Sequence, residues 1–201
     1  TTRTAALVRD ARSRGAAVTA EVTPHHLILS PGRIDPDDPD ASFKMKPPLV
    51  SAENRASLLR GLSEGVFSAV ATDHAPHAPA NKENGFQEAP FGAIGMETAF
   101  PVLFTELVKK DLISLSELVY FFTEGPCGIF DIPFAEIKPG TGAEFILVDP
   151  DKKWKVKKET QLSRSRNCPF DGMTVTGNIE TVVSKGTVLY ERNTDQRTCG
   201  K

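Results

Sequence analysis

The sequence predicts an α/β fold built on a parallel sheet, followed by a smaller β-rich part. Over the first 77 residues, apolar patterns of helical and strand period alternate in the order helix, strand, loop, helix, strand. This alternation is typical of parallel sheets, in which a helix connects one strand to the next. From about residue 137 onward, short strand-like runs separated by turn residues replace the helices.

The first predicted strand follows an amphipathic helix. Apolar residues at helical spacing occupy the N-terminal segment as far as Gly15, a residue type that commonly ends helices. Residues 17–23 then alternate between apolar and polar side chains, which predicts a strand. This strand ends at Pro24, His25 and His26.

A long polar loop separates this pair from the second helix and strand. Residues 30–42 are rich in proline, aspartate and serine, and the two prolines after Lys46 force an extended path. Ser51 then caps a helix that ends at Gly65, and residues 67–72 form the next strand. The chemistry of such folds gathers at the carboxyl ends of the strands, where both predicted strands end in histidine-containing motifs.

The middle of the chain is predicted to be loop and then helix. Residues 78–95 form a loop whose glycines let the backbone approach a ligand closely, or simply turn before a helix. Ser114 and Glu117 form a capping box at the start of a later helix. The predicted helices are residues 97–110, residues 115–124 and, after a break at Gly125-Pro126, a short turn through residue 130.

The last third of the chain is predicted to be a small β-module. Residues 144–149 form a strand closed by Pro150, and residues 181–190 form a hairpin around the turn Lys185-Gly186. Five lysines surround Trp154. This pattern indicates either a nucleic-acid contact or, more commonly, a solvated linker or a strand edge protected by charge.

Composition excludes several classes of protein. The 201 residues carry a formal net charge of −2, so the surface as a whole is not built to bind nucleic acid. The sequence has no run of about 18 apolar residues that would predict a transmembrane helix, and its N-terminus has no signal-peptide pattern. Cys127, Cys168 and Cys199 are widely spaced, which indicates free thiols in a reducing compartment such as the cytoplasm. Because the chain opens inside a helix without an initiator methionine, we expect a fragment of a longer protein.

The motif at residues 73–77 carries most of the functional information. Asp73, His74 and His77 lie within five positions at the end of a predicted strand, and Pro76 stiffens the loop. A carboxylate held at a rigid strand end near a histidine suits metal binding and acid–base catalysis. The alternative is a solvated Asp–His turn without a function.

This motif resembles the second signature of the dihydroorotases, members of the amidohydrolase superfamily. The matching string is Ala71-Thr72-Asp73-x-Ala75-Pro76-His77-x4-Lys82. Four further matches are residues 18–26 to the seventh barrel strand, residues 44–49 to a substrate loop, residues 90–98 to the loop and helix after the eighth strand, and residues 139–144 with 167–172 to the C-terminal β-sandwich. Allantoinases and dihydropyrimidinases are similar in outline but lack the histidine four residues after the aspartate.

The resemblance implies the C-terminal part of a (β/α)8 TIM barrel with an appended small β-sandwich module. Residues 1–136 are then the C-terminal portion of a metal-dependent hydrolase barrel, and residues 137–201 are the β-sandwich segment. The family uses two zinc ions, and Asp73 is the one zinc ligand that carries over to this chain. The other ligands belong to earlier strands upstream, so the fragment alone is expected to be inactive.

The implied reaction is the reversible hydrolysis of the cyclic amide of dihydroorotate to N-carbamoyl-aspartate, in de novo pyrimidine biosynthesis. By resemblance, Asp73 binds zinc and carries the proton from the attacking water to the leaving nitrogen, and His77 holds the substrate carboxylate. Lys46 stands where many relatives have asparagine, and it can pair with that carboxylate as a point charge. The backbone of Pro90 and Gly92 is expected to contact the pyrimidine ring.

Two other functions stay open on the sequence alone. One is a different cyclic amidase of the hydantoinase or allantoinase type, and the other is an inactive dihydroorotase-like scaffold subunit of aspartate transcarbamoylase. The presence of Asp73 and His77 argues against the scaffold. His25 and His26 are interpreted as hydrogen-bonded structural histidines and not as zinc ligands.

The expected partners are the small-molecule substrate and a second copy in a homodimer, with aspartate transcarbamoylase as a candidate. No nucleic-acid or membrane partner is expected.

Overall fold

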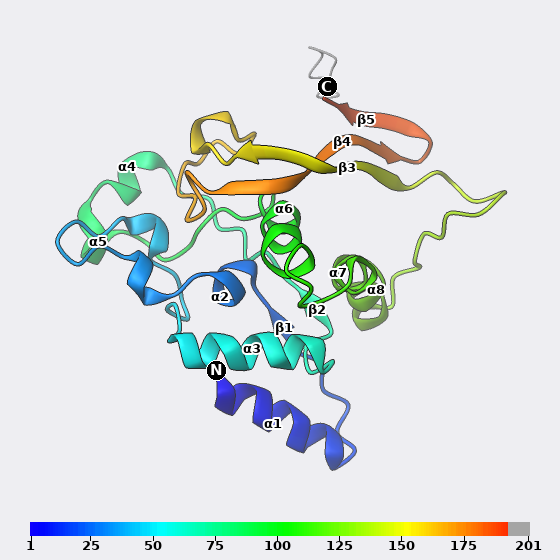
Figure 1. Cartoon of the computed structure of the whole chain (residues 1–201), viewed down its shortest axis with the longest axis horizontal. Coiled ribbons are helices and arrows are strands. Elements are labelled where there is room, and N and C mark those ends of the chain that lie inside the picture. The colour runs from blue at the N-terminus through cyan, green and yellow to red at the C-terminus, as the bar shows by residue number, and fades with distance from the viewer. Residues whose placement is uncertain (193–201) are drawn as a thin grey trace.

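The computed structural model describes residues 1–192, so the predicted free thiol Cys199 and the end of the segment 137–201 lie outside the described residues. Figure 1 shows a three-stranded sheet across one side of the molecule, with helix α6 (Ala99–Leu103) directly beneath it. Helices α1 (Thr2–Ser13) and α3 (Ala52–Ser63) lie on the opposite side. A short parallel strand pair runs between these layers.

The parallel pair confirms the predicted α/β alternation. Strand β1 (Glu21–Val22) pairs in parallel with β2 (Ala69–Val70), and α3 lies between them in the chain. The predicted strand bounds, residues 17–23 and 67–72, were wrong, because each observed strand is only two residues long. Among the described residues each has only one neighbouring strand, so one edge of each carries no ladder.

Helices occupy several positions for which the sequence predicted none. Helix α2 (Pro24–Ile28) begins directly after β1, with Thr23 as its N-cap, and contains both histidines of the first motif. The loop predicted at residues 78–95 contains two single helical turns, α4 (Pro79–Lys82) and α5 (Gly85–Glu88). The polar loop before α3 contains two 3-10 turns, η1 (Pro31–Arg33) and η2 (Ala41–Phe43).

The helix predicted at residues 97–110 is irregular. Helix α6 starts at Ala99 and continues as a π-helical turn, η3 (Phe104–Val108), in which Lys109 N–H donates to Phe104 C=O at 2.9 Å. Pro101 has no N–H group. A regular helix that began at Glu97 would therefore lack the hydrogen bond from residue 101 to the C=O of Glu97.

The next two helices are present as predicted, but the break between them is at Thr123 and not at Gly125-Pro126. Helix α7 (Leu115–Phe122) has the predicted capping box, formed by Ser114 and Glu117. Helix α8 (Glu124–Phe130) follows at once, with Pro126 in its first turn, where a missing N–H costs little.

The C-terminal part forms one antiparallel sheet in the order β3-β4-β5. These strands are β3 (Phe145–Lys155), β4 (Thr174–Ser184) and β5 (Thr187–Glu191), with a 3-10 turn η4 (Lys158–Thr160) after β3. The predicted hairpin is confirmed, with Lys185 and Gly186 both at positive φ. Pro150 does not close β3 as predicted, because the ladder skips from Asp149 to Lys153 and resumes. The lysine-rich run thus lies partly on an edge strand.

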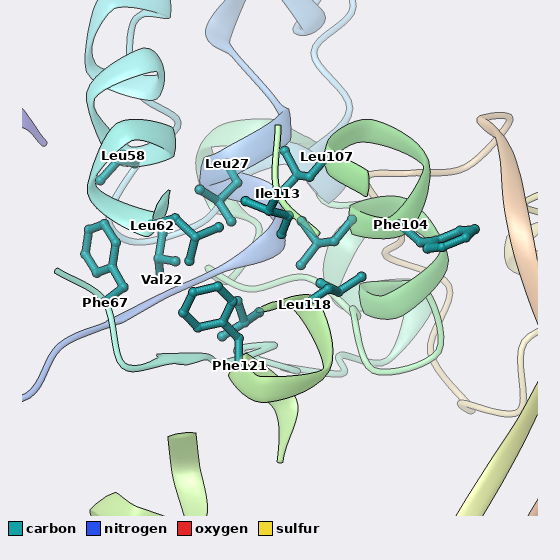
Figure 2. Close-up of a cluster of buried hydrophobic side chains, with 12 residues drawn as sticks. Val22, Leu27, Leu58, Leu62, Phe67, Phe104, Leu107, Ile113, Leu118 and Phe121 are labelled. Carbon is teal, nitrogen blue, oxygen red and sulfur yellow. The ribbon is translucent and has the colours of Figure 1, made fainter. Parts of the chain in front are cut away.

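Two buried apolar clusters hold these parts together. Figure 2 shows the first, in which Leu58 and Leu62 of α3 and Phe121 of α7 pack around β1. The second joins Met45 and Ile94, from loops after the parallel strands, to Phe170 and Val175 of the C-terminal part. The segments on either side of the predicted boundary at residue 136 therefore share a core. Cys127 and Cys168 are free thiols, as predicted.

Within residues 1–192, no helix combines the length and the apolar character needed to cross a membrane.

Candidate active site

Asp73 lies three residues beyond the end of β2, in a backbone conformation that few residue types adopt. Its φ is 47°, in the left-handed region that aspartate and asparagine tolerate better than most other side chains. The side chain is exposed, and its carboxylate makes no hydrogen bond or ion pair with another residue of the described range 1–192. The local chain thus places a free carboxylate at the carboxyl end of a parallel strand.

His74, the next residue, uses its Nδ1 to bind the protein backbone, so this nitrogen is not available to a ligand. Its Nδ1 accepts hydrogen bonds from the N–H groups of Gly95 and Met96, each at 3.2 Å. A nitrogen that accepts carries no proton, so the ring is held as the Nε2–H tautomer. His74 also forms a parallel bridge with Ala93, which joins the loop of residues 73–77 to the loop of residues 90–95.

His77 is held by the second of these two loops. Its Nε2 lies 2.8 Å from the C=O of Phe91, and a carbonyl can only accept, so Nε2 carries the proton. Its Nδ1 makes no hydrogen bond to another residue among those described. A carboxylate bound at Nδ1 therefore requires the imidazolium form of His77, in which both nitrogens donate.

Gly92 is required where these two loops meet. A Cβ at this position would lie 2.6 Å from the Cβ of Ala75 and 3.0 Å from Nε2 of His77, and φ of Gly92 is 130°. Gly92 N–H donates to Lys44 C=O at 2.9 Å. The glycine at position 92 thus allows the backbone to lie close to the loop of residues 73–77, and not to a ligand as the sequence suggested.

Lys82, the last residue of the sequence signature, connects the polar loop at Ala41 to the loop of residues 90–95. Its Nζ donates to the C=O groups of Ala41 and Pro90, at 2.9 and 2.8 Å. Burial, and then the nearby charge of Lys44, lowers the pKa of Lys82 to about 8, against the opposing effect of Asp40. The carbonyl of Pro90 is thus occupied by Lys82. Sequence reasoning assigned no role to Lys82, and its contacts show a supporting one.

Lys46 is exposed and makes no hydrogen bond or ion pair to any described residue, Asp73 and His77 included. Its neighbours anchor the segment instead. Lys44 Nζ donates to Gln87 C=O and lies 4.9 Å from the ring centroid of Phe91. Lys46 is therefore held near the site only through the backbone on either side of it.

The histidine pair at residues 25 and 26 is buried, with ring centroids 4.5 Å apart. Nε2 of His26 lies 3.0 Å from Pro47 C=O and Nδ1 lies 2.7 Å from Thr23 Oγ1, so both nitrogens are used within the protein. Burial lowers the pKa of His26, although its hydrogen bonds and the charge of Asp73 act in the opposite direction. Burial, and then His26, lowers the pKa of His25 to about 3, and its Nε2 has no partner among the described residues.

Two buried residues that the sequence did not assign to the site complete it. Ser165 and Asn167 lie between η4 and β4, and each is 3% exposed. Asn167 Nδ2 donates to the C=O groups of Ala75 and Gly92, at 3.1 and 3.0 Å. In the sequence, Asn167 stands out only as a polar residue near Pro169, within the β-sandwich pattern.

Metal-ligating side chains are sparse in this part of the molecule. Within residues 1–192, no group of three or more His, Cys, Asp or Glu side chains is placed to hold a metal ion. Asp73 is free to serve as one ligand, whereas His26 and His74 use their ring nitrogens, wholly or in part, within the protein itself.

A family model for the amidohydrolase family matches residues 13–189. The chain belongs to the amidohydrolase family. The matched residues include both the parallel strand pair and most of the C-terminal sheet, so the two parts belong to one amidohydrolase pattern.

Known amidohydrolases resemble the chain in sequence and in structure. Dihydroorotases of Bacillus licheniformis and Bacillus subtilis are each 43% identical to it over 187 residues. That match covers 92% of this chain and 43% of each relative, so the chain spans less than half the length of these relatives. A dihydropyrimidinase of Brevibacillus agri superposes with a TM-score of 0.85 at 27% identity, over 93% of this chain and 42% of that one.

Proposed function

We propose that this chain is part of a dihydroorotase, which hydrolyses the cyclic amide of dihydroorotate reversibly to N-carbamoyl-aspartate. The observation that carries the proposal is His77, four residues after Asp73 in a chain 43% identical to dihydroorotases. This spacing separates dihydroorotases from related cyclic amidases. The pathway would be de novo pyrimidine biosynthesis.

Each site residue has a role that its surroundings support. Asp73, whose carboxylate is unpaired among residues 1–192, accepts the proton of the attacking water and returns it to the leaving nitrogen. His77 holds the substrate carboxylate through Nδ1, since Nε2 is engaged by Phe91. Lys46 adds a positive charge from an exposed position. The loop of Pro90 and Gly92 forms the wall beside the substrate ring.

Zinc fits the donor chemistry of Asp73, but residues 1–192 hold no group of three ligands that could complete a site. A free carboxylate at a strand end is a suitable zinc ligand, and one ligand is too few for a closed site. When bound, zinc would activate water and polarise the amide carbonyl. Two ions are proposed for the complete enzyme, with the further ligands supplied by the part of the protein that this chain does not include.

The same proposal extends to architecture. The parallel pair β1–β2 would be two strands of a (β/α)8 TIM barrel, and its unpaired edges would meet further strands of the longer protein. Residues 1–136 would belong to the barrel and residues 137–201 to a β-sandwich, of which the sheet β3-β4-β5 forms one layer. The free thiols favour a cytoplasmic enzyme. A homodimer, with aspartate transcarbamoylase as a further partner, completes the proposal.

A hydantoinase-like activity is the second candidate, because the chain superposes well on a dihydropyrimidinase. The full-length protein should be assayed with dihydroorotate, hydantoin and allantoin. We expect kcat/KM for dihydroorotate to exceed the other two values by at least about 100-fold, roughly 2.7 kcal/mol of transition-state binding. A preference for hydantoin or allantoin would contradict the proposal.

His77→Ala provides the matched control for this assay. Dihydroorotate carries a carboxylate and hydantoin does not, so removal of His77 should raise KM for dihydroorotate and leave any hydantoin turnover unchanged. An equal effect on both substrates would show that His77 does not read the carboxylate.

A further inference from the structure

Two buried side chains of the C-terminal part hold the loops that carry the proposed site residues. The side chains of Ser165 and Asn167 form hydrogen bonds to residues that precede them by 75 to 92 positions in the chain. Both are 3% exposed, so their polar groups must be satisfied within the protein. Their partners are the backbone groups of the segments 75–77 and 92–94.

The amide of Asn167 is matched to two carbonyls at once. Its two Nδ2 hydrogens serve Ala75 C=O at 3.1 Å and Gly92 C=O at 3.0 Å, one in each loop. Its backbone C=O accepts from Ile94 N–H at 3.0 Å. Only asparagine combines this length with two donors on one atom, because aspartate and leucine of similar shape have none.

The side chain of Ser165 binds the backbone of His77. His77 N–H donates to Ser165 Oγ at 3.1 Å, and Ser165 Oγ lies 2.7 Å from His77 C=O. Oδ1 of Asn167 is a second acceptor within reach of Ser165 Oγ, whose single hydrogen serves either this oxygen or His77 C=O. The hydroxyl and the amide therefore lie in contact beside the two loops.

We propose that Asn167 and Ser165 are positioning residues that set the geometry of the substrate-binding loops from the C-terminal part of the chain. The inference rests on the proposed function, because it assigns substrate binding to these loops. The two residues touch no substrate. They fix the distance between the loop of His77 and the loop of Gly92, whose backbones already meet at the His74–Ala93 bridge.

The test compares two buried asparagines in the full-length protein. Asn178, 1% exposed, lies in β4, and its side chain is hydrogen-bonded to Glu180 and Arg192, outside both site loops. Asn167→Ala should raise KM for dihydroorotate by about tenfold or more, with a smaller change in kcat, whereas Asn178→Ala should leave KM unchanged. Equal KM values in the two variants would overturn the proposal.

A second readout does not depend on catalysis. Amide hydrogen exchange over residues 73–77 and 90–95 should accelerate in Asn167→Ala and stay at the wild-type rate in Asn178→Ala. Unchanged exchange in both would overturn the proposal even if KM moved. A wild-type protein without dihydroorotate turnover would refute the proposed function, and the exchange comparison would still test the positioning role.

Ser165→Ala keeps the test decisive if Asn167→Ala does not fold. This smaller change removes the hydroxyl that holds His77 and leaves the bonds of Asn167 to Ala75 and Gly92 in place. We expect a rise in KM of the same sign and faster exchange confined to residues 73–77. A wild-type KM together with wild-type exchange would overturn the proposal.

Discussion

His25 is a buried histidine that the fold keeps neutral. It is 3% exposed, and its Nε2 has no partner among the described residues. Burial lowers its pKa to about 3 from an ordinary value of 6.5. The folded protein therefore does not protonate His25 in mildly acidic solution, whereas the unfolded chain does.

Stability should fall on acidification because of this difference. Below pH 6.5 the unfolded state takes up a proton at His25 and the folded state does not until about pH 3, so unfolding is favoured across that window. Between pH 7.5 and 5.5 the loss should be about 1 kcal/mol from this residue. Urea unfolding of the full-length protein should show a smaller loss in His25→Leu than in wild type. An equal loss in both would contradict the assignment.

The sequence singles out individual residues only where the signal is local, and the roles of those residues stay predictions. Asp73 and His77 lie in one short motif, and the structure shows the first unpaired among the described residues and the second held by Phe91. The role of Asn167 was not predictable, because its partners lie 75 and 92 positions away and no pattern in one sequence encodes such a contact. The role of Lys82 was not predictable for the same reason, since the carbonyl of Ala41 that it binds is distant in the chain.

Secondary-structure elements followed their local signals where hydrogen bonding is local. The capping box fixed the start of α7, and the Lys185-Gly186 turn fixed the hairpin of β4 and β5. Strand lengths in the parallel pair could not be read from the alternation of side chains, because they depend on neighbouring strands. The π-helical turn after α6 likewise has no marker in the side-chain pattern.

Helix α8 packs against the start of β2 through a glycine. A Cβ on Gly125 would lie 2.1 Å from the backbone oxygen of Ser68, the residue before β2. A Cβ on Gly128, in the same helix, would meet no described atom within 4 Å. One helix thus contains a glycine that the packing requires and one that it does not.

These two glycines make a matched pair of variants. Gly125→Ala should lower the free energy of unfolding by about 1–3 kcal/mol, since backbone must move to relieve the clash. Gly128→Ala should leave stability unchanged or raise it by up to about 1 kcal/mol, because alanine favours helix. Urea unfolding of the full-length protein measures both. Equal effects would show that α8 does not lie against β2 as described.

The molecule as a whole joins its two predicted parts through the site. The second apolar cluster places Phe170 and Val175 against Met45 and Ile94, and the hydrogen bonds of Asn167 lie beside it. The C-terminal part, through β4 and the segment before it, therefore supports the loops at the ends of β1 and β2. The α/β class was predictable from the order of elements, whereas this shared core depends on tertiary packing that the sequence does not display.

The most direct test of the proposed function is to measure dihydroorotate turnover and bound zinc in full-length Asp73→Ala, with Asp111→Ala as control. Both aspartates are exposed and have positive φ, so both variants carry the same backbone penalty. We predict that Asp73→Ala loses at least about 100-fold in kcat and binds less zinc, while Asp111→Ala behaves as wild type. Wild-type turnover in Asp73→Ala would contradict the proposed role of this carboxylate.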